Sequence, residues 1–178
     1  MLTNSQIKTK RFFLRCLTTL DATQKYLAWM TDAVTKKYIV SASEQWTIGT
    51  LKKFILKVSE KEDALFLGIF VLETNEHIGN IKLERLNRTI GSCELGVLIG
   101  EPSWRGRGVF SEVFHALQEY VGTELGIERI FLGVDKSNTV AIQSYIKSGF
   151  MITEVKYFKS MDSDKSITMV ASYQRTNM

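Results

Sequence analysis

Two segments decide the fold of this chain: residues 104–110, which read WRGRGVF, and residues 138–150, which read NTVAIQSYIKSGF. In the first segment, Gly106 and Gly108 lack a Cβ atom, so the backbone can adopt positive φ and lie close to a bulky anion. The amphipathic run 109–124 predicts a helix directly after this loop, and the free N–H groups and dipole of a helix N-terminus favour a phosphate. The segment therefore predicts an anion-binding loop.

Arg105 and Arg107 add two charges to this loop that can hydrogen-bond a phosphate or pyrophosphate. Two other phosphate motifs do not fit. A Walker A loop requires Gly-Lys-Ser/Thr after a four-residue gap, and a dinucleotide fingerprint requires three glycines, a βαβ context and a distal carboxylate. For this loop alone, a glycine-rich turn on a solvated basic surface remains the alternative.

The second segment predicts a helix with a marked start and end. Asn138, Ala141, Tyr145 and Gly149 are three or four residues apart, so they share one helix face. Asn138 is a suitable N-cap after the strand predicted at 129–134, and Gly149 ends the helix before an apolar run that predicts another strand. By spacing alone, Tyr145 is either a functional phenol or core packing.

The remaining elements predict an α+β fold in a single domain, residues 1–178, because the length suits one core and no linker or repeat divides the chain. Hydrophobic periodicity and turn signals give their order. We expect a strand at 10–17, a helix capped by Asp21 and ending near residue 31, a helix at 42–60, a hairpin of strands 64–72 and 77–86, a strand at 92–100, and two closing strands that begin at Phe150 and Ser166.

Composition excludes several classes of function. The longest apolar stretch, 64–72, is too short for a membrane span and the N-terminus has no signal-peptide core, so we expect a cytoplasmic protein with no membrane partner. Cys16 and Cys93 with only two histidines are too few for a metal site. The net charge of +4 is spread among acidic residues, which argues against nucleic-acid binding and suits a polyanionic cofactor.

Together the two segments resemble the acetyl-CoA-dependent N-acetyltransferases of the GNAT superfamily. The loop matches the family pattern Gln/Arg-x-x-Gly-x-Gly/Ala with Arg105 and Gly108 in register, whereas Phe110 departs from the usual Gly or Ala. We expect Phe110 to shift the loop or narrow the cofactor channel without removing the amide donors. Further likeness at 9–21, 78–81 and 94–100 resembles the RimJ/RimL-type subgroup, so that the resemblance runs from about residue 7 to about residue 155.

The resemblance implies a GNAT fold: a mixed, mostly antiparallel central sheet of about six to seven strands, with helices on both faces. It also implies that the sheet is splayed between the strand before the phosphate loop and the following strand. The cosubstrate would be acetyl-CoA, without a metal. The residues expected to bind it are Leu98, Ile99, Arg105, Gly106, Arg107, Gly108, Val109, Phe110, Asn138, Ala141 and Tyr145.

The implied reaction is direct attack of a primary amine on the thioester in a ternary complex. Tyr145, by resemblance, protonates the departing thiolate, and a backbone N–H near Leu98 or Ile99 polarises the carbonyl. Glu94 is our preferred base, while Glu84 and Glu101 are alternatives near the expected cleft.

The sequence says least about the amine that accepts the acetyl group. We expect the acceptor wall to include Trp29, Tyr38, Trp46 and Glu84, since aromatic rings can stack on a sugar or base and a carboxylate can hold a cationic amine. Trp29 also fits core packing. A protein N-terminal amine, a polyamine, an amino-sugar nucleotide and another small amine all remain open, as does a homodimer. A non-catalytic acyl-CoA-binding sensor with the same fold is the alternative function.

Overall fold

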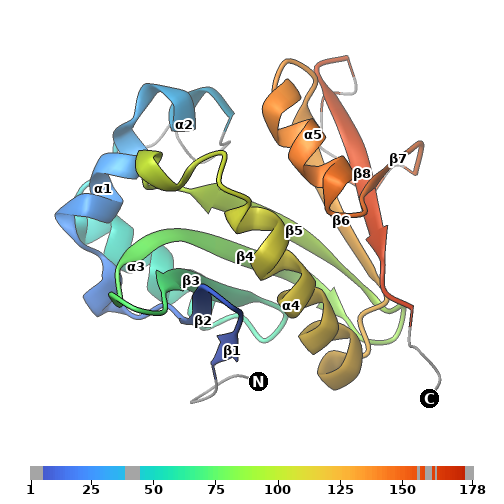
Figure 1. Ribbon diagram of the computed structural model, residues 1–178, viewed down its shortest axis with the longest axis horizontal. Helices are drawn as coiled ribbons and strands as arrows, with labels where there is room; N and C mark the ends of the chain where they lie inside the picture. The colour runs from blue at the N-terminus through green and yellow to red at the C-terminus, as the bar shows by residue number, and fades with distance from the viewer. Residues whose placement is uncertain (1–5, 39–44, 156, 159–161, 163, 175–178) are drawn as a thin grey trace.

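A central β-sheet organises the molecule, shown in Figure 1 as a computed structural model that describes residues 6–38, 45–155, 157–158, 162 and 164–174. Within these residues, eight strands form one sheet in the order β1-β2-β3-β4-β5-β6-β8-β7. The added strand beyond the expected seven is the two-residue β1. The strands are β1 (Ile7–Lys8), β2 (Phe12–Cys16), β3 (Leu65–Val71), β4 (His77–Asn87), β5 (Ser92–Ile99), β6 (Arg129–Asp135), β7 (Met151–Thr153) and β8 (Ser166–Ser172).

Helices cover both faces of the sheet, as expected. One apolar cluster joins α1 (Gln24–Thr31) and α3 (Ile48–Ser59) to the sheet through side chains such as Phe66. A second cluster joins α4 (Val109–Leu125) to the opposite face through side chains such as Leu67. The α5 helix (Thr139–Lys147) packs on the α4 side, and α2 (Ala33–Tyr38) follows α1 (Figure 1). No helix among the described residues is long and apolar enough to cross a membrane.

The first helix begins later than predicted, because Asp21 is not its N-cap. Thr23 caps α1 instead, with its Oγ1 accepting a hydrogen bond from the Tyr26 amide at 3.2 Å. The Asp21 carboxylate is buried and accepts bonds of 2.6 and 2.9 Å from the Arg15 guanidinium. A carboxylate can cap a helix or pair with an arginine from a neighbouring strand. In this structure Asp21 pairs with Arg15 and does not cap α1.

The second helix is also shorter than predicted. The α3 helix begins at Ile48, after Thr47, whose hydroxyl accepts from the Thr50 amide at 3.1 Å. Residues 42–44 of the predicted helix lie outside the described residues. The short α2 helix was not predicted, since six residues show too little periodicity to be recognised.

The sheet opens between β5 and β6, as the resemblance implied. These two parallel strands pair only at Ser92–Glu94 with Arg129–Phe131. Beyond Glu94, the ladders of the described residues join β5 to β4 and β6 to β8 alone. One edge of β5, residues 95–99, therefore has no strand beside it in the described part of the chain, and its amides can pair with a ligand.

Candidate active site

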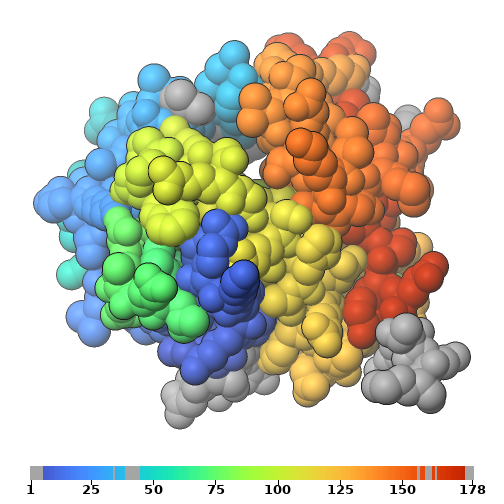
Figure 2. All heavy atoms as spheres, viewed as in Figure 1, coloured from blue at the N-terminus to red at the C-terminus, as the bar shows by residue number. Residues whose placement is uncertain are grey.

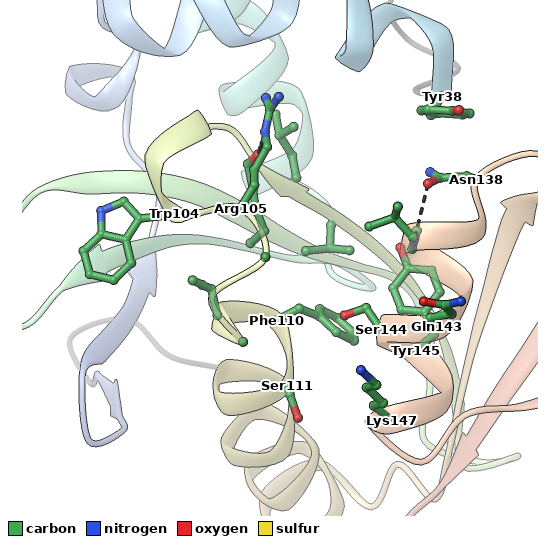
Figure 3. Close-up of a pocket in the computed structure, with 18 of the residues that line it drawn as sticks. Tyr38, Trp104, Arg105, Phe110, Ser111, Asn138, Gln143, Ser144, Tyr145 and Lys147 are labelled. Carbon is green, nitrogen blue, oxygen red and sulfur yellow. Dashed lines mark hydrogen bonds between the residues drawn. The ribbon is translucent and has the colours of Figure 1, made fainter.

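A cavity of about 490 Å³ lies where the unpaired edge of β5 meets the glycine loop and α5. Its wall is formed by residues 97–99, by the loop and first turn of α4, and by one face of α5 (Figure 3). Thr35 and Tyr38 of α2 also line it. The space-filling view shows a hollow between these segments (Figure 2). The two segments that decide the fold thus lie on opposite sides of one cavity.

The glycine loop has the geometry of an anion cradle. Gly106 and Gly108 both have φ of +71°, a left-handed conformation that disfavours other residues. Gly108 is the N-cap of α4 and provides no side-chain hydrogen bond to the helix. The first amides of the helix, at Val109–Ser111, have no carbonyl one turn earlier, so they can bind an anion in the cavity.

Arg105 has a different role from the one its charge suggested. Its Nε donates to the Ile99 carbonyl at 3.0 Å, and its Nη2 donates to the Gly100 carbonyl at 2.9 Å. Nη2 also lies 3.6 Å from Asp32 Oδ2. The guanidinium therefore fastens the loop to the end of β5, and because Arg105 also lines the cavity, its contact with an anion stays a prediction.

Arg107 is the one predicted cofactor residue that does not line the cavity in the described part of the chain. Its carbonyl accepts a 3.0 Å bond from Arg11 Nη2, and its guanidinium lies over the Trp104 ring, 5.7 Å from the centroid. The loop is thus held from both sides, by Arg105 at its start and by Arg11 at its centre.

Phe110 points away from the loop into the core. Its side chain is only 6% exposed and stacks on Phe114, with the ring centroids 5.3 Å apart. Its ring stands perpendicular to that of Tyr145, with centroids 5.0 Å apart, across the space between α4 and α5 (Figure 3). The bulk that departs from the family pattern therefore forms the inner wall of the cavity, and the backbone amide stays at the helix start.

Tyr145 lies on the face of α5 that borders the cavity. Burial raises the pKa of its phenol to about 12, so the hydroxyl remains protonated at neutral pH. The helix that carries it is capped as predicted, with Asn138 Oδ1 accepting from the Ala141 amide at 3.3 Å. A protonated phenol on a fixed helix is suited to donate a proton into the cavity.

Glu94 lies on the other face of the sheet. Along β5, Cys93 and Leu95 pack in the cluster under α4, whereas Leu98 packs against the α1 and α3 side, which is also the side of Glu94. Burial raises the pKa of the Glu94 carboxyl, partly opposed by Arg85, whose Nη1 lies 3.3 Å away. As the last β5 residue paired with β6, Glu94 lies where the sheet opens.

Glu84 is directly opposite Glu94 in the β4–β5 ladder. Burial would raise the pKa of the Glu84 carboxyl, but hydrogen bonds from Lys61 at 2.7 Å and Lys82 at 2.6 Å bring it below its ordinary value. Neither glutamate lines the cavity, so the structure separates them from the phosphate loop by the thickness of the sheet.

The three aromatic residues predicted for the acceptor wall have different positions. Trp29 is buried beneath Gly100, and Trp46 is buried against Phe54, both within the apolar cluster of α1 and α3. Only Tyr38 of the three reaches the cavity. The sequence did not predict the other residues that line the cavity: Thr35, Val97, Trp104, Ser111, Val140, Gln143, Ser144 and Lys147. Those on α5 follow helical spacing from the predicted residues of this helix, and this spacing could have identified them.

Comparisons with known proteins agree with this geometry. The family model described as the acetyltransferase (GNAT) domain matches residues 11–151. The uncharacterized N-acetyltransferase p20 of Bacillus licheniformis is 29% identical over 149 residues, covering 80% of this chain and 83% of the relative.

Two solved structures share the fold at low identity. The ribosomal L7/L12 α-N-protein acetyltransferase RimL in complex with coenzyme A has a TM-score of 0.79 at 14% identity, covering 94% of this chain and 98% of that one. The spermidine N-acetyltransferase of Vibrio cholerae in complex with CoA and spermine has a TM-score of 0.74 at 19% identity, covering 90% and 95%.

Proposed function

Because this chain belongs to the acetyltransferase (GNAT) domain family, we propose that its cavity binds acetyl-CoA and that the acetyl group passes to a primary amine. The protein is an acetyl-CoA-dependent N-acetyltransferase by family. One observation carries the assignment of the cavity: three features border the same space. They are the unpaired edge of β5, the two left-handed glycines, and the start of α4, which has no side-chain cap. The likeness at 9–21, 78–81 and 94–100 supports membership of the RimJ/RimL-type subgroup.

We assign the pyrophosphate and the pantetheine arm of the cofactor to different parts of the cavity wall. The amides of residues 106–111 would hold the pyrophosphate, because they converge at a helix N-terminus. The free edge of β5 at Leu98 and Ile99 would pair with the amides of the pantetheine arm, as a strand pairs with a neighbour. The thioester then lies near the point where β5 and β6 separate.

The proposed reaction uses groups from both faces of the sheet. Glu94, directly or through water, takes the proton from the acceptor ammonium, and the free amine attacks the thioester carbon. A backbone N–H near Leu98 or Ile99 stabilises the oxyanion. The new N–C bond forms, the C–S bond breaks, and Tyr145 gives its proton to the departing thiolate. The nitrogen loses its second proton as the intermediate collapses, and this proton passes through water to restore the Tyr145 phenol. The high pKa of Tyr145 and the raised pKa of Glu94 suit these opposite duties.

The alternative is a sensor that binds acetyl-CoA without transferring the acetyl group. The purified protein should be incubated with acetyl-CoA and a panel of amines and peptides, while released thiol and the mass of each acceptor are measured. We expect thiol release that requires an amine, matched by the mass gain of one acetyl group. Calorimetric binding of CoA without turnover on any amine would favour the sensor, and absence of both would contradict the assignment of the cavity.

A further inference from the structure

Five charged side chains gather on the α3 face of the sheet around the proposed base: Lys61, Lys82, Glu84, Arg85 and Glu94. We call them the acceptor-face cluster. Lys61 and Lys82 both bind Glu84, and Arg85 binds Glu94. The Lys82 ammonium also lies over the Phe54 ring of α3, 5.6 Å from its centroid, so Lys82 is held in place from two sides.

The cluster borders the opening between β5 and β6. Glu94 is the last residue paired across the two strands, and Gly96, the next β5 residue on the same face, is exposed. A Cβ atom added at Gly96 would meet only the Lys82 side chain, at 3.9 Å. The surface beside Glu94 is therefore open, and an amine that reaches the opening from this face has the cluster around its remaining atoms.

Arg85 takes part in the cluster through an unusual backbone conformation. It has φ of +53°, in the left-handed region, within a β-bulge between Glu84 and Asn87. Such a conformation is strained in a residue other than glycine, and bulges redirect side chains. Here the bulge brings the guanidinium to Glu94, on the face where Glu84 already lies.

The balance of this cluster is positive toward solvent. Three cations face two carboxylates, and each carboxylate already has a partner. The side chains of Lys61 and Arg85 are 42% and 59% exposed, whereas those of Glu84 and Glu94 are 22% and 28% exposed. The Lys82 side chain, at 26%, is as shielded as the carboxylates, so an incoming molecule meets Lys61 and Arg85 first.

From this arrangement we propose that the natural acceptor is an amine that carries an anionic group, a phosphate or a carboxylate, a few atoms from the reacting nitrogen. This inference rests on the proposed acetyl transfer. The anionic group would lie against Lys61, Lys82 and Arg85, while the amine reaches Glu94. A polyamine fits poorly, because the cluster has one more cation than it has carboxylates, so a second ammonium would add like charge to it.

Matched acceptors test this charge preference. Glucosamine 6-phosphate is compared with glucosamine, and a peptide with two glutamates after its N-terminal residue is compared with one that has two lysines, with spermidine as the polyamine. We expect kcat/KM to be about fivefold or more higher for the anionic member of at least one pair at low salt, and the difference to shrink as salt rises. The pair that shows the larger difference distinguishes a small phosphorylated acceptor from a protein N-terminus.

Higher kcat/KM for spermidine, or equal values within both pairs, would overturn the inference while leaving acetyl transfer intact. No thiol release with any amine would instead overturn the acetyl transfer itself, and the inference with it.

A matched pair of variants tests the cluster directly. Lys61→Gln removes one exposed cation of the cluster and leaves Lys82 on Glu84. Lys8→Gln removes an exposed cation from β1, at the far edge of the sheet. We expect Lys61→Gln to lower kcat/KM about threefold more for the anionic acceptor than for the neutral acceptor, and Lys8→Gln to change neither value. Equal losses for both acceptors in Lys61→Gln would contradict an anion contact.

Discussion

At the scale of single residues, the proposed acid is a half-buried phenol held by aromatic packing. Tyr145 contacts the rings of Phe110 and Phe150, and its hydroxyl has no hydrogen bond to another described residue. Tyr145→Phe should therefore leave the thermal midpoint nearly unchanged and lower kcat by about 100-fold or more, because a positioned acid contributes that much. Thiol release and a thermal melt on the same sample measure both effects, and full kcat in a folded variant would remove Tyr145 from the mechanism.

Glu94 predicts a particular pH dependence. Burial raises the pKa of its carboxyl, and a base works only when ionised, so kcat/KM should fall as the pH decreases through a value above that of an exposed glutamate. Glu94→Gln should lower kcat/KM by about 100-fold and abolish this acid limb. Acceptor amines of different pKa provide the control, because a limb caused by the amine moves with the acceptor. An unchanged limb in Glu94→Gln would assign the proton transfer elsewhere.

At the site residues, sequence patterns among near neighbours predict the backbone conformation better than they predict where a side chain points. Asn138 caps its helix and Gly106 and Gly108 adopt positive φ, because each property depends on immediate neighbours in the sequence. The side chains of Arg105 and Phe110 could not be placed this way. The partners of Arg105 include Asp32, far away in the sequence, and the pocket of Phe110 exists only after α4 and α5 have packed.

At the scale of elements, α4 provides a built-in comparison, because it has a left-handed glycine at each end. Gly108 has φ of +71° at the start and Gly126 has φ of +68° at the end, and an added Cβ would clash at neither. Alanine should therefore cost similar stability at both positions, about 1 kcal/mol, or roughly 2–4 °C in the thermal midpoint of a protein this size. Only Gly108→Ala should also raise KM for acetyl-CoA, since only the start of α4 borders the cavity.

Steady-state kinetics at varied acetyl-CoA and thermal melts measure the two effects separately. Equal KM values in Gly108→Ala and Gly126→Ala would mean that the conformation of the loop does not matter for the cofactor. A rise in KM in both variants would mean that helix stability, rather than the loop, controls binding.

Periodicity and turn residues predicted the elements nearest the site well, with α4 and β5 within one residue of their predicted ends. The same patterns gave the wrong start for α1, which precedes the β3–β4 hairpin. Asp21 has the chemistry of an N-cap, and no local pattern reveals that Arg15 binds its carboxylate after the strand and turn have packed. Side chains with several possible partners are decided by tertiary contacts, which sequence spacing does not contain.

At the scale of the whole molecule, the sheet separates the two halves of the proposed reaction. The cavity with Tyr145 lies on the α4 face, the acceptor-face cluster with Glu94 lies on the α3 face, and the opening between β5 and β6 connects them. Spacing in the sequence does not predict this opening, because it depends on where β6 leaves β5 while continuing along β8. The resemblance to a family implied it, and the ladder confirms it.

This division predicts where CoA should slow amide hydrogen exchange. Saturating CoA stabilises the folded protein by about 2.7 kcal/mol at 100 times Kd, so amides that exchange only by global unfolding slow throughout the chain. Amides that open locally report the contact site, and short labelling times select them. At short times we expect slower exchange at residues 97–99, 105–111 and 138–145, which border the cavity, and no change at the exposed end of α3. Slower exchange centred on α3 and the acceptor-face cluster would instead place the cofactor on the α3 face of the sheet. The cavity would then be left for the acceptor, the reverse of our proposal.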